Sequence, residues 1–180
     1  MAIRTILRDS DPSLRKKSRI VSDFNPRMHK LLDDMRETLL EANGLGLAAP
    51  QVGVLRRAVL VVDTSREEGD EDAVIELINP EIIAREGEQE GNEGCLSVPG
   101  VYGIVKRPET VTVRAFDRFG NEFEVSGEGL TARAFCHEID HLDGILFSDL
   151  ASRFLTKEEL DEIARGDAEE DADAEEDGGE

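Results

Sequence analysis

The chain has 180 residues and a formal net charge of −20, with 41 acidic residues against 21 Lys and Arg. This length suits one domain with its own hydrophobic core. The acidic balance excludes a generic nucleic-acid binder and a binder of anionic membranes, because both partners require clustered Lys and Arg. The opening segment has no apolar signal region, and no apolar run is long enough to span a bilayer. We therefore expect a cytoplasmic protein that contacts neither nucleic acid nor membrane.

Apolar residues recur at helical spacing from Asn25 to Ala42, and this pattern predicts an amphipathic helix that ends at Asn43 and Gly44. Strand-like runs follow at 57–63, 74–79, 110–116 and 122–126. The last two flank a turn and predict a hairpin. Further helices are predicted over 131–142 and 155–164. Antiparallel strands with helices beside them indicate an α+β fold.

The last segment, 167–180, contains nine acidic residues and no Lys or Arg. It has no large apolar side chain whose burial would offset the entropy cost of ordering. We therefore expect a folded body at 1–166 and a disordered acidic tail at 167–180.

His137, Glu138 and His141 form the pattern His-Glu-x-x-His. On a helix, two histidines four positions apart share one face with their Cβ atoms about 6 Å apart, so both imidazoles reach one metal ion. Glu138 would lie beside the metal, where a carboxylate can take a proton from water. A surface helix could carry this pattern by chance, but two of the three histidines in the chain fall in it. The third, His29, lies in a polar context and is predicted to be solvated.

A catalytic metal usually takes three protein ligands, so a third must come from elsewhere. One candidate is Cys95, because glycines and a proline make a shaped loop around it. The other is Glu162, as in the zinc peptidases that share the histidine pattern. Read one motif at a time, the sequence leaves this choice open. Cys136 points about 100° around the helix from His137 and is predicted to be a small buried packing residue.

The run from Gly44 to Gly53 consists mostly of small and apolar residues and contains one amide, Gln51. It lacks the Gly-Lys-Ser/Thr ending of a phosphate loop and the third glycine of a dinucleotide fingerprint. It is either a tight structural turn or a segment whose backbone approaches a ligand while Gln51 donates to an oxyanion.

Three segments in this order resemble the signature motifs of the peptide deformylases: Gly44 to Gln51, Glu93 to Ser97, and Cys136 to Gly144. The resemblance favours Cys95 as the third ligand. It implies a hydrolase of protein biosynthesis that removes the formyl group from the N-terminal formylmethionine of new polypeptides and releases formate. It also implies one Fe2+ ion, for which Zn2+, Ni2+ or Co2+ can substitute, on a helix between antiparallel sheets.

The resemblance carries over residue by residue. The implied metal ligands are Cys95, His137 and His141. Glu138 would transfer protons, while Gln51 and the backbone N–H of Leu96 would stabilise the oxyanion. The positions that match substrate-binding residues are Leu45, Gly46, Gly94, Tyr102, Leu130 and Ala134. Tyr102 departs from members that have a basic residue there, and Arg107 matches a basic position expected to brace the site.

The implied partners are N-formylmethionyl nascent peptides, with the enzyme acting as a monomer near the ribosome. Three rival hypotheses remain at this stage. The first is an endopeptidase that uses Glu162 as a metal ligand. The second is a structural zinc protein in which a fourth side chain completes the coordination of the metal. The third is a diverged deformylase homologue that works as a binding protein without catalysis.

Overall fold

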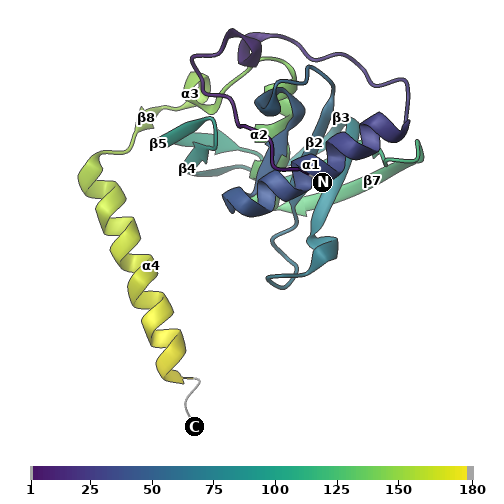
Figure 1. The fold of residues 1–180 in the computed structure, drawn as a ribbon. Helices are drawn as coiled ribbons and strands as arrows, with labels where there is room; N and C mark the ends of the chain where they lie inside the picture. Colours follow the sequence, from purple (N-terminus) through teal and green to yellow (C-terminus); the bar gives the residue numbers. More distant parts are fainter. Residues whose placement is uncertain (1, 178–180) are drawn as a thin grey trace.

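The computed structural model describes residues 2–177, with side-chain surroundings through Asp167. Its body consists of two antiparallel sheets and the helices packed on them (Figure 1). The larger sheet has the order β1-β2-β3-β6-β7, with strands Gly46–Ala48, Ala58–Val62, Val74–Glu86, Thr110–Phe116 and Glu122–Glu128. The smaller sheet has the order β4-β5-β8, with strands Gln89–Cys95, Val98–Arg107 and Arg153–Phe154. The fold is α+β, as predicted, and β6 and β7 form the predicted hairpin.

In the described part of the chain, four α-helices accompany the sheets: α1 Pro26–Ala42, α2 Leu130–Leu142, α3 Phe147–Leu150 and α4 Lys157–Asp177. Three 3-10 helices lie between strands or before α1: η1 Pro12–Arg15, η2 Ala49–Val52 and η3 Glu71–Ala73. Helix α1 begins where the sequence predicts, because the Asn25 side chain accepts the N–H of Met28 at 3.1 Å. It ends at Asn43, which adopts the left-handed conformation with φ 52°.

Strand β2 is buried on both faces, which explains its unbroken apolar sequence. Ala58 and Leu60 pack with α1, whereas Val59 and Val61 pack with α2. Successive side chains of a strand point to opposite faces, so α1 and α2 cover opposite sides of the larger sheet. Helix α2 is buried along almost its whole length. The element that carries both predicted metal histidines is therefore held rigidly in the core.

Two expectations about local structure were wrong. The glycines and proline around Cys95 predicted a shaped loop, whereas strands β4 and β5 pair there and leave only a turn at Leu96 and Ser97 between them. His29 is half-buried rather than solvated, with its Nε2 atom 2.6 Å from the carbonyl oxygen of Arg118 and its ring against Phe119.

Helix α4 is longer than the predicted segment 155–164 and projects away from the body (Figure 1). It extends into the predicted acidic tail, of which residues 178–180 lie outside the described part of the chain. The sequence 167–180 has no large apolar side chain to bury, and an isolated polar helix gains little stability, so disorder of this segment in solution stays a prediction. Among residues 2–177, no helix is both long and apolar enough to cross a membrane.

Candidate metal centre

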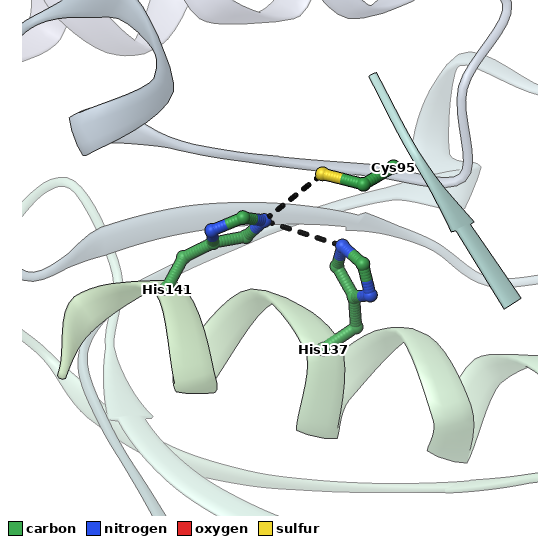
Figure 2. Close-up of side chains that lie close together, drawn as sticks. All are labelled: Cys95, His137 and His141. Carbon is green, nitrogen blue, oxygen red and sulfur yellow. Dashed lines mark hydrogen bonds between the residues drawn. The ribbon is translucent and has the colours of Figure 1, made fainter. Parts of the chain in front are cut away.

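Cys95, His137 and His141 meet between the smaller sheet and α2 (Figure 2). Cys95 ends β4, and the two histidines lie one helical turn apart on α2. Their ligand atoms all lie within 4.8 Å of one another. The Nε2 atom of His141 is 3.4 Å from the Cys95 sulfur and 3.2 Å from Nε2 of His137. One sulfur and two imidazole nitrogens form a donor set that suits Fe2+ or Zn2+.

Glu93 on β4 orients the first of these histidines. Its Oε2 atom lies 2.7 Å from Nδ1 of His137, which leaves Nε2 directed at Cys95 and His141. Arg107 donates to the same carboxylate at 2.7 Å and Arg133 at 3.0 Å. A carboxylate bound to the second imidazole nitrogen is the usual support for a metal-ligating histidine.

The charges of the site are set by burial and by these hydrogen bonds. Burial alone would raise the pKa of Glu93, but hydrogen bonds from His137 and Arg107 outweigh it and lower the pKa to about 2. In His137, burial is outweighed by hydrogen bonds with Cys95 and Glu93, so its pKa rises well above the usual value. Burial and the adjacent His137 lower the pKa of His141. Histidine binds a metal through a neutral imidazole, so a divalent cation would displace any proton held on the ligand nitrogens of this pair.

Glu138 lies beside the ligands, with its Oε1 atom 3.9 Å from Nε2 of His137. Its Oε2 atom is buried and has no hydrogen-bond partner among the described residues. A buried carboxylate oxygen of this kind calls for a water or a ligand. Burial raises the pKa of Glu138 to about 7, and the nearby His137 lowers it only in part. Gly46 makes room for this carboxylate, since a Cβ atom at Gly46 would lie 2.7 Å from Oε1.

A cavity of ≈ 490 Å³ opens beside these groups. The residues from the sequence analysis that line it are Leu45, Gly46, Gly94, Cys95, Leu96, Tyr102, Leu130, Ala134, His137 and Glu138. Leu45 and Leu130 are exposed apolar side chains, which suits a cavity for an apolar substrate group. Gln51 and His141 do not line the cavity and are each only 1% exposed. The Nε2 atom of Gln51 nevertheless lies 3.5 Å from the Cys95 sulfur.

The structure also separates the alternatives that the motifs left open. Glu162 is exposed on the projecting helix α4, away from the histidines. Cys136 is buried in the core between α2 and the larger sheet, as predicted for a packing residue. Arg107 braces the site through Glu93 and Asp140, the latter at 2.7 Å. The support of His137 by Glu93 and Arg133 was not predicted, although Glu93 lies in the motif around Cys95.

Comparison with known proteins agrees with this geometry. The sequence model of the polypeptide deformylase family matches residues 3–157. The peptide deformylase of Caldicellulosiruptor bescii is 56% identical over 168 residues, which cover 93% of this chain and 97% of that protein. That of Lachnoclostridium phytofermentans is 57% identical over 147 residues, or 82% and 88% of the two chains.

Solved structures give the same result. A peptide deformylase from Legionella pneumophila superposes with a TM-score of 0.78 at 45% identity, covering 93% of this chain and 98% of that one. A deformylase from Acinetobacter baumannii with bound Met-Ala-Ser gives a TM-score of 0.75 at 34% identity, covering 83% and 98%. The chain therefore belongs to the polypeptide deformylase family.

Proposed function

We propose that this enzyme hydrolyses the N-formyl group of formylmethionyl nascent peptides, using a metal ion held by Cys95, His137 and His141. One observation carries the proposal. The three candidate ligands and Glu138, whose Oε2 atom has no partner among the described residues, come together beside a cavity that Leu45, Leu130 and Ala134 help to line. A neighbouring deformylase structure contains bound Met-Ala-Ser, a peptide that begins with methionine.

The peptide would lie along β1, which is an edge strand of the larger sheet. Sheet edges accept extended peptides through main-chain hydrogen bonds, and Gly46 would offer its backbone in this way. The methionine side chain would enter the cavity between Leu45, Leu130 and Ala134. Gly94 and Tyr102, which pair across β4 and β5, would contact the next residues of the peptide.

Fe2+ is the proposed ion, and when bound it would polarise the formyl carbonyl and make a water molecule more acidic. Glu138 would accept a proton from that water as the oxygen attacks the formyl carbon. The Gln51 amide and the Leu96 N–H would donate to the oxyanion, and loss of one such donor elsewhere costs about 10² to 10³ in kcat. Glu138 would then return the proton to the leaving amine, which yields formate and a free N-terminus.

The first test is anaerobic turnover of a formyl-Met peptide by the iron-loaded protein beside Cys95→Ala. We expect formate release by the wild type and loss of both metal and activity in the variant. A metal-replete wild type that releases no formate would contradict the proposed function.

A second variant separates proton transfer from metal binding. Glu138→Gln keeps the ligand set and should keep the metal, but it should lose turnover because an amide cannot accept the proton. Turnover near the wild-type rate would refute the role of Glu138. Loading with Zn2+, Ni2+ or Co2+ in place of Fe2+ would identify the ion that best supports the reaction.

We further propose a cytoplasmic monomer with a catalytic domain at 1–166 and an acidic tail at 167–180 that works near the ribosome. The tail would meet basic ribosomal proteins rather than RNA, which repels it. Unchanged ribosome association after deletion of 167–180 would contradict this use of the tail.

A further inference from the structure

Ser97 follows Cys95 closely in the chain, is fully buried, and points its hydroxyl at Gln51. We propose that Ser97 is a positioning residue that orients the Gln51 amide toward the reacting formyl group. This inference rests on the proposed function, because it assigns Ser97 a role in stabilising the oxyanion of that reaction.

The orientation of the Gln51 amide follows from its partners. The backbone N–H of Ala48 donates to one atom of the amide at 2.9 Å, so that atom must be the oxygen, Oε1. The amide nitrogen therefore faces the opposite side. There it lies 3.1 Å from Oγ of Ser97 and 3.5 Å from the sulfur of Cys95. The Ser97 hydroxyl thus accepts one N–H, and the other is directed at the Cys95 sulfur.

The two residues are also held through their backbones by one N-terminal segment. The N–H of Leu7 donates to the Gln51 carbonyl at 2.7 Å, and the N–H of Asp9 donates to the Ser97 carbonyl at 3.0 Å. These bonds do not involve either side chain. Removing the Ser97 hydroxyl should therefore leave the backbone in place and release only the amide nitrogen of Gln51.

Without the Ser97 hydroxyl, the amide keeps the Ala48 N–H on its oxygen and the long contact of its nitrogen with the Cys95 sulfur, so the direction of its second N–H is less tightly fixed. Donors that stabilise an oxyanion must be aimed before the reaction, and a misplacement of about 1 Å can cost about 10²-fold in rate. We expect Ser97→Ala to lower kcat about ten- to hundredfold with little change in KM. Loss of a side chain that only stabilised the fold would not lower kcat while leaving KM unchanged.

The matched control is Ser18→Ala. Ser18 is also a buried serine, but its hydroxyl has no hydrogen-bond partner among the described residues. This control should keep the wild-type kcat. Chelator competition should give the same metal affinity for Ser97→Ala as for the wild type, because all three ligands remain. Weakened metal binding would overturn the proposal by placing the effect of Ser97 on Cys95.

A double-mutant cycle provides the decisive comparison. If Ser97 acts through the Gln51 amide, Ser97→Ala should cost nothing further in a Gln51→Met background. An additive loss, or an unchanged kcat in Ser97→Ala alone, would overturn the proposal. If Ser97→Ala fails to fold, Ser97→Cys retains a weak acceptor and should give an intermediate kcat, whereas a wild-type kcat would overturn it. Absence of formate release by the wild type would instead overturn the proposed function.

Discussion

Gly46 offers a sharp test of how closely Glu138 is placed. In Gly46→Ala, the new Cβ atom would lie 2.7 Å from both Cγ and Oε1 of Glu138, whereas ordinary van der Waals contact begins at 3.4 Å. The carboxylate must therefore move by about 0.7 Å. Since a misplacement of about 1 Å can cost about 10²-fold, we expect kcat to fall about ten- to hundredfold.

The same change should hardly affect folding. Gly46 does not have a positive φ, so alanine fits its backbone, and among residues 2–177 the Oε2 atom of Glu138 has no hydrogen-bond partner to lose. Overpacking of this size costs about 1 kcal/mol in the free energy of unfolding. Kinetics with a formyl-Met peptide and urea unfolding would measure the two effects. Gly166→Ala is the control, because nothing lies within 4 Å of its new Cβ atom. A wild-type kcat for Gly46→Ala would refute the reasoning.

Three further predictions concern other parts of the molecule. Glu93→Gln should weaken metal binding about 10- to 100-fold, because His137 loses its carboxylate partner. Chelator competition would measure the metal affinity, and an unchanged affinity would contradict this prediction. Cys136→Ala should keep the metal affinity and lose about 1 kcal/mol of stability, whereas loss of metal in the same assay would make Cys136 part of the site. Burial raises the pKa of Asp34, but hydrogen bonds from the Ala2 N–H and Arg4 outweigh it and lower the pKa below 3.8. Its stabilising effect is thus present above pH 3.8 and lost as the pH falls through the lowered pKa. Asp34→Asn should therefore destabilise the protein at neutral pH and differ less from the wild type at about pH 3 in urea unfolding; an equal difference at both would contradict this.

The parts of the fold that the sequence predicted are those with a strong local pattern. Helix α1 has both its apolar spacing and its capping residues, Asn25 and Asn43, written in the sequence. The His-Glu-x-x-His pattern places His137 and His141 on one face of α2 whatever surrounds it. The choice of Cys95 over Glu162 needed the resemblance, because the distance between β4 and α2 is a property of the whole fold.

Strands β4 and β5 were missed because their local signals point to turns. Gly91, Gly94, Pro99 and Gly103 interrupt any apolar alternation, so these strands owe their form to pairing with each other. The close pairing needs such residues: a Cβ atom at Gly94 would lie 2.5 Å from the ring of Tyr102. The support of His137 by Glu93 was hidden for the same reason, since it depends on which strand lies behind α2.

The three candidate metal ligands come from different layers of the domain. Cys95 belongs to the smaller sheet, whereas His137 and His141 belong to the helix packed on the larger one. An ion that binds all three fastens one sheet to the other, and it stabilises the native state by about 2.7 kcal/mol at a free concentration one hundred times its Kd. Chelation should therefore accelerate amide hydrogen exchange in β4 and β5 first, while the doubly covered strand β2 stays protected until the whole domain unfolds.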